Sequence, residues 1–329
     1  MNHYKKINLM FLTLMIGFNM GLSQTSYSGD LNFYYLSAQN DNHLINIPYR
    51  MIDLHIRHQN ENLEIFGDLA MEYSPQQHTH FLSSSNPQDF LWDLRELYMT
   101  WYTDFGEIRL GKQIHTWGSV DENSPIDVVN AFDYYYLFFQ GADRKLGSYS
   151  AAIDLYANDF KLGAVLSPFH HTNRVPVNDP AFPIRLPIVP QEYQIYPIEK
   201  VPMEYGAFIE YSHNYGDIRL SGFSGYDRLF NLSGINAFFQ SESQTGSPDI
   251  DIVYGYRKTN MIGVGGTMLF EDLILRGDYA FFRTEDQNKR INRENPNPSL
   301  GWLYSYLAEE YPLSEKADYF QDLAECDLR

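Results

Sequence analysis

Arginine recurs at one position of three expected β-hairpins, and this spacing could build a ring of positive charge. The fifth residue after the turn centre is an arginine in each of them, and Thr or Glu stands opposite: Arg109, Arg219 and Arg276 face Thr100, Glu210 and Thr267. Rings of charged side chains set ion preference where they surround a water-filled passage. The alternative is that polar residues on one face of a sheet simply pair with facing carboxylates, as Glu210 and Arg219 can.

Strands in which apolar and polar residues alternate must position these arginines. The clearest hairpin covers residues 96–115 and turns at residues 104–105. Because successive side chains of a strand point to opposite faces, this turn pairs Trp101 with Ile108 on an apolar face and puts the polar residues on the other face. With the next hairpin, that polar face supplies the remaining candidate pore-lining residues, which are Glu96, Gln113, Asp154 and Lys161.

Four further turn centres, at residues 59–60, 158–159, 214–215 and 271–272, show the same alternation. Short turns of two residues alternate along the chain with much longer connections. Outer-membrane β-barrels have this arrangement, with short periplasmic turns and long external loops. The pattern therefore predicts an all-β fold, a transmembrane antiparallel β-barrel with about 12 strands visible. We expect it to be part of a 16-strand-type barrel truncated at the C-terminus.

The two ends of the chain carry separate signals. Lys5 and Lys6 precede a short apolar run that ends in small residues, so residues 1–23 are expected to be a secretory signal peptide and residues 24–329 the barrel. The first strand is expected at 27–40. A twelfth would cover 318–329, but there the alternation is lost, so C-terminal hairpins are expected to be missing.

The composition excludes several classes of function. The net charge of −18 is opposite in sign to that of a nucleic-acid-binding protein, so no nucleic-acid partner is expected. Aromatic residues make up 16% of the chain, which suits the girdles of a membrane barrel. Mean hydropathy is −0.39, and a soluble secreted sandwich is the alternative that this value leaves open.

The residues give little sign of a cofactor or of catalysis. The single cysteine, Cys326, forms no zinc motif, and the histidines at 78, 80, 170 and 171 lack a carboxylate at set spacing. We therefore expect no cofactor, no metal and no enzymatic activity. A barrel enzyme acting on lipid would need a nucleophile beside a histidine, and His115 with nearby Ser119 is a poor case.

Five short motifs resemble a widespread family of porin-like outer-membrane barrels of Gram-negative bacteria. They are LREL at 94–97, IRLGKQ at 108–113, WG at 117–118, DVVN at 127–130 and DRKLG at 143–147. The resemblance implies a cell outer membrane location and a porin-like channel for small solutes. Some members look like parts of lipid or hydrophobic-compound transport systems with an inner-membrane efflux-type pump.

The function predicted from these signals is passive or substrate-selective passage of small-molecule or lipid-like solutes. The expected partners are outer-membrane lipid, the barrel-assembly machinery and the efflux-type pump. A lipid-acting barrel enzyme and a non-conducting adhesin or assembly partner are the alternatives. The segment 116–148 is the candidate for folding inward and narrowing the barrel, although its aromatic residues 134–139 could instead extend a strand at the outer girdle.

Overall fold

The computed structural model describes most of the chain between residues 24 and 285. The described ranges are 24–34, 47–74, 90–120, 124–137, 139, 143–176, 195, 198, 201–238 and 249–285. The expected signal peptide, the expected twelfth strand and the histidines at 78 and 80 lie outside them. Within these ranges, no helix is long and apolar enough to cross a membrane.

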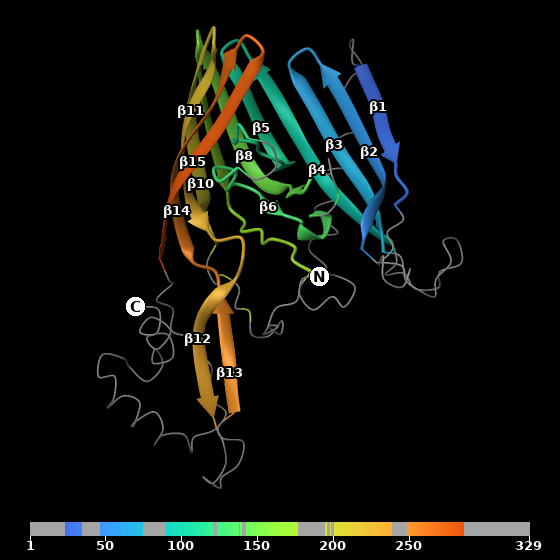
Figure 1. Cartoon of the computed structure of the whole chain (residues 1–329). Coiled ribbons are helices and arrows are strands. Elements are labelled where there is room, and N and C mark those ends of the chain that lie inside the picture. Colours follow the sequence, from blue (N-terminus) through green and yellow to red (C-terminus); the bar gives the residue numbers. More distant parts are fainter. Residues whose placement is uncertain are drawn as a thin grey trace.

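Eleven strands form one antiparallel sheet in which neighbours in sequence are neighbours in space. Figure 1 shows this sheet as a curved wall whose edges are β1 and β15. The strands are β1 (Gln24–Leu31), β2 (Tyr49–Asn60), β3 (Leu63–Tyr73), β4 (Phe90–Thr103), β5 (Gly106–Gln113), β8 (Ser148–Ala157), β9 (Phe160–Ser167), β10 (Glu204–His213), β11 (Gly216–Tyr226), β14 (Lys258–Phe270) and β15 (Leu273–Glu285).

Four of the five expected hairpin registers are confirmed, among them Thr100 with Arg109 and Glu210 with Arg219. The β2–β3 register is wrong, because the turn lies two residues later and Ile56 pairs with Gly67 instead of Leu63. Side chains alternate with a period of two, so a shift by an even number of residues keeps every side chain on its face. The hydrophobic pattern therefore cannot distinguish the two registers.

Smaller elements lie outside the main sheet. Between β5 and β8 lie β6 (Ala131–Phe132), the 3-10 helix η3 (Tyr134–Tyr136) and β7 (Lys145–Leu146). A second ribbon, β12 (Asn231–Phe238) and β13 (Asp249–Gly255), extends beyond the end of the wall in Figure 1. The sequence pattern did not predict this ribbon, because a bulge between Leu232 and Gly234 interrupts its alternation. The first strand, expected at 27–40, begins three residues earlier and ends at Leu31.

Among the residues that the structure describes, no second layer packs against the apolar face of the wall. Trp101, Leu110 and Leu220 on this face are 55%, 54% and 54% exposed. An apolar face of this extent is unfavourable in water and is what the wall of a transmembrane barrel presents to lipid. The fold is therefore that of an outer-membrane β-barrel wall, as the sequence predicted, and the soluble-sandwich alternative is wrong.

Candidate functional site

The described residues of the connection between β5 and β8, which are 114–120, 124–137, 139 and 143–147, lie inside the curve of the sheet and are called the inner loop below (Figure 1). Its Trp117, Ile126 and Val129 are at most 5% exposed. They pack with inner-face residues of four strands, which are Ala152, Val165, Phe223 and Met261. The loop thus folds against the wall on the side opposite the lipid, as the sequence predicted.

Two inner-face glycines make room for this loop. A Cβ atom on Gly206 of β10 would lie 2.5 Å from Cη2 of Trp117. A Cβ atom on Gly263 of β14 would lie 2.3 Å from Cγ2 of Ile126. Real Cβ atoms do not approach other atoms so closely, so the loop can sit at this depth only because both positions lack a side chain.

Polar contacts anchor the inner loop to strands far along the sequence. The backbone N–H groups of Ser119 and Val120 donate to Oδ2 of Asp278 on β15, at 2.9 and 3.0 Å. Arg219 on β11 donates to the backbone oxygen of Trp117. Inside the loop, Oδ1 of Asp127 accepts from the backbone N–H of Trp117 at 2.6 Å. The loop begins after β5, in the middle of the sheet, and these contacts fix it to the edge strand β15.

Arg228, just after β11, holds the middle of the inner loop. Its guanidinium lies 2.8 and 2.9 Å from the two carboxylate oxygens of Glu204, which is 3% exposed. It also donates to the backbone oxygens of Val128, at 3.2 Å, and Val129, at 2.7 Å. One cation thus joins the start of β10 to the loop.

The aromatic part of the inner loop forms η3, so the expectation of a strand extension at the outer girdle is wrong. Asp133 caps η3 by accepting from the backbone N–H of Tyr135 at 3.0 Å. Tyr136 is 2% exposed and donates to Glu72 of β3 at 3.1 Å. Its ring also faces the guanidinium of Arg50, 4.2 Å from the ring centroid. The wall itself covers this aromatic segment.

Arg174 joins this segment to β3 and to the connection after β9. It donates to both carboxylate oxygens of Glu72, at 2.6 and 2.7 Å, and to Asp133 at 3.1 Å. Burial alone would lower the pKa of Arg174, but its hydrogen bonds to Glu72 and the charge of Asp133 raise it. Burial raises the pKa of Asp133, and the charge of Arg174 opposes that shift.

Most of the candidate pore-lining residues form ion pairs or hydrogen bonds on the inner face. Asp154 binds Arg109 at 3.0 Å and Lys161 at 3.2 Å, and Glu210 binds Nε of Arg219 at 2.8 Å. Among the rest, Gln113 donates to the backbone oxygen of Ser150, Glu96 accepts from the backbone N–H of Ile114, Thr100 is buried, and Arg276 pairs across the sheet with Thr267.

The three arginines do not form one contiguous cluster. Arg109 lies on β5 and Arg219 on β11, with three strands between them, which is roughly 19 Å at the usual strand spacing. Arg109 and Arg219 are each paired with a carboxylate, Asp154 and Glu210 respectively. The local geometry therefore agrees with the alternative in which polar residues of the inner face pair with nearby carboxylates. An effect of these residues on ion preference stays a prediction.

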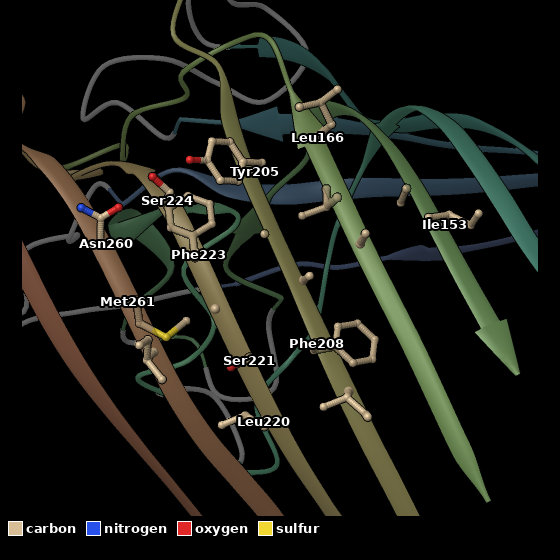
Figure 2. Close-up of a pocket in the computed structure, with 18 of the residues that line it drawn as sticks. Ile153, Leu166, Tyr205, Phe208, Leu220, Ser221, Phe223, Ser224, Asn260 and Met261 are labelled. Carbon is tan, nitrogen blue, oxygen red and sulfur yellow. The ribbon is translucent and has the colours of Figure 1, made fainter. Parts of the chain in front are cut away.

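The outer face carries a groove of about 1100 Å³ (Figure 2). Its floor is a row of small residues on neighbouring strands, Ala164, Ala207 and Gly222. The next row of the groove lining is polar. It consists of Tyr205, Ser224 and Asn260, which are cross-strand neighbours on β10, β11 and β14 (Figure 2). Trp117 does not line this groove, because it covers the opposite face.

His115, two residues after β5, is 5% exposed and contacts Ser150, which was not predicted from the sequence as its partner. Its Nε2 atom lies 2.9 Å from Oγ of Ser150 on β8. Burial lowers the pKa of His115 to about 3, and the nearby charges of Arg109 and Lys145 act in the same direction. The imidazole is therefore neutral at pH 7, and the same surroundings oppose the imidazolium that accepting a proton would form.

Several residues that fix the inner loop were not predicted from the sequence, although two of them lie within the motifs noted there. Trp117 and Asp127 lie within the motifs WG and DVVN, which were noted only for the resemblance. Arg174, Arg228 and Asp278 carried no signal, because their partners lie 24 to 159 residues away in sequence. Nothing in a single sequence reports such contacts.

Comparison with known proteins gives a similarity of fold only. No family model matches the chain, and no curated protein matches it. One similar solved structure is that of OmpT (in-vitro folded), an outer membrane protein of Vibrio cholerae. The TM-score is 0.41 at 12% identity, and the match covers 81% of this chain and 64% of that one. The chain thus spans less than two thirds of the protein that it resembles.

The prediction that the chain has no enzymatic activity is contradicted. It assumed that His115 has no suitable serine partner, and Ser150 provides one at 2.9 Å. The likeness to OmpT, which is named only as an outer membrane protein, gives no ground for excluding catalysis either. The firm exclusion of catalysis is therefore wrong.

Proposed function

We propose that this chain forms the wall of an outer-membrane channel for small solutes, with the inner loop as its constriction. The observation that supports this most is the division of the two faces. The outer face is apolar and exposed, whereas the inner face carries paired charges and holds a loop anchored as far away as Asp278. A polar interior narrowed by an inward loop suits the passage of small hydrophilic or charged solutes.

Contact with outer-membrane lipid forms part of this proposal. The groove above Ala164, Ala207 and Gly222 opens on the lipid-facing side and is lined mainly by apolar atoms. Acyl chains fit such a surface, since it offers apolar contact without competing hydrogen bonds. Passage of lipid-like solutes, the inner-membrane efflux-type pump, the barrel-assembly machinery and the signal peptide at residues 1–23 remain proposals on the same footing.

Replacing Arg109 and Arg219 together with alanine is expected to shift the ion preference of the channel towards cations. The change leaves Glu210 without its cation and leaves Asp154 with Lys161 alone, so the interior becomes more negative. The measurement is the reversal potential of single channels in planar bilayers under a salt gradient. The matched control, Arg283→Ala, removes an exposed charge from the outer face and should leave the reversal potential unchanged.

Unchanged reversal potentials in the double variant would contradict a role of these arginines in ion selection. A reconstituted wild-type chain that never conducts would contradict the channel itself. In that case the adhesin or assembly-partner alternative would be favoured.

The contact between His115 and Ser150 favours a second candidate, hydrolysis of a lipid ester. A serine hydroxyl within hydrogen-bond distance of an imidazole is the pairing that a serine nucleophile and its base require, and here burial and the charges of Arg109 and Lys145 oppose the proton transfer. If this candidate is correct, a fluorophosphonate probe should label the wild type, the Ser150→Ala variant should lose the label, and Ser148→Ala, on the same strand and face, should keep it. An unlabelled wild type would reject the candidate.

A further inference from the structure

We propose that Asp53, His55 and Asp68 bind one divalent transition-metal ion on the inner face of β2 and β3. Nε2 of His55 lies 3.8 Å from Oδ1 of Asp53 and 3.7 Å from Oδ1 of Asp68. One ligand atom from each of the three residues falls within 4.8 Å of the other two. The three atoms thus form one face of a coordination site.

The strand geometry brings these residues together. Asp53 and His55 are two residues apart on β2, so their side chains share a face. Asp68 stands directly opposite His55 on β3. The ring of Phe66 on β3 is stacked on that of His55, with centroids 6.1 Å apart, and this contact limits rotation of the imidazole. The pairing of β2 with β3 therefore positions the three ligand residues, which are called the tripod below.

Two oxygens aimed at the centre of the tripod have no other partner. Oδ1 of Asp53 and Oδ1 of Asp68 are both buried and form no hydrogen bond. The side chain of Asp68 is only 5% exposed. A buried carboxylate oxygen without a partner is costly, and a bound cation would remove that cost. These are the same atoms that face His55.

The charges around the tripod leave room for a divalent cation. A bulge in β4 leaves Arg95 without a cross-strand partner, and Arg95 binds Asp143 at 2.8 Å. It reaches the outer oxygens of the pair, Oδ2 of Asp68 at 3.4 Å and Oδ2 of Asp53 at 3.7 Å. One arginine thus faces three carboxylates while the two Oδ1 atoms stay free. A doubly charged ion would balance the remaining charge.

The donor set indicates a transition metal rather than Ca²⁺ or Mg²⁺. One imidazole nitrogen with two carboxylate oxygens suits Zn²⁺ and its neighbours, whereas Ca²⁺ and Mg²⁺ prefer oxygen alone. Ligands about 2.0–2.1 Å from a tetrahedral ion lie about 3.4 Å from one another, so the two spacings between His55 and the aspartates, 3.7 and 3.8 Å, need to close by only a few tenths of an ångström. His55 is partly exposed, which leaves a fourth position open to water.

The test uses the full chain refolded in detergent, with Zn²⁺ followed by titration calorimetry and Co²⁺ by its visible spectrum. We expect one ion per chain and a tetrahedral Co²⁺ spectrum. His55→Ala and Asp68→Asn should each weaken Zn²⁺ binding about tenfold or more. The matched control is His58→Ala, which removes a histidine from the opposite face of the same strand and should bind like the wild type.

Two outcomes would overturn the proposal. A wild-type chain that binds neither Zn²⁺ nor Co²⁺ would show that these three residues do not form a metal site. Binding that survives in both variants would place the ion elsewhere. Far-ultraviolet circular dichroism of each variant shows whether it has folded, and Asp53→Asn gives a third, independent change should one variant fail to refold.

Discussion

Replacing Gly206 with valine is expected to push the inner loop off the wall and to raise the single-channel conductance. The first added carbon would lie 2.5 Å from the ring of Trp117, which is 3% exposed. Overpacking of this kind costs about 1–3 kcal/mol, so the loop leaves its position more readily than the strand deforms. Conductance in planar bilayers and a red shift of tryptophan fluorescence are the measurements.

The matched control for this change is Gly222→Val on the neighbouring strand. Gly222 lies on the outer face, and the nearest atom to an added Cβ is the backbone oxygen of Met261 at 3.7 Å. A valine there would meet lipid, so wild-type conductance is expected. If both variants conduct like the wild type, the inner loop does not limit the passage of ions.

Replacing Arg228 with methionine is expected to lower the free energy of unfolding by about 3–5 kcal/mol, the usual cost of removing one partner from a buried ion pair. Glu204 would lose its guanidinium partner at 3% exposure, and the backbone oxygens of Val128 and Val129 would lose their donor. Urea unfolding of the detergent-refolded chain measures the loss.

The double variant Arg228→Met with Glu204→Gln separates the ion pair from the packing of the arginine. A neutral amide at residue 204 removes the uncompensated charge, so part of the lost stability should return. A double variant as unstable as Arg228→Met would show that the carboxylate of Glu204 is not the source of the loss.

The alternation of side chains and the residues at the tight turns were enough to predict most of the wall. At Asn158 and Glu271, backbone φ angles of 52° and 43° mark turns that the sequence had located correctly. The β2–β3 turn was misplaced because its two registers put the same side chains on the same faces. An error of this kind leaves the assignment of lipid-facing residues intact.

Much less of the candidate site could be predicted. The pair of Glu210 and Arg219 lies within one hairpin and was anticipated. The pair of Arg109 and Asp154 joins strands separated by the inner loop, so its register depends on how that loop folds. The proposed metal site was not predicted from the sequence for a related reason. Only the correct β2–β3 register sets Asp68 opposite His55.

The contact between Ser119 and Asp278 has a consequence for the order in which the molecule matures. The two residues are 159 positions apart, and contacts of such separation form late because a long stretch of chain must first be arranged. A nascent chain therefore passes through a stage in which β5 exists but Asp278 is not yet in place to hold Ser119. Chaperoning of the inner loop during export would protect Trp117 and Ile126 from premature association.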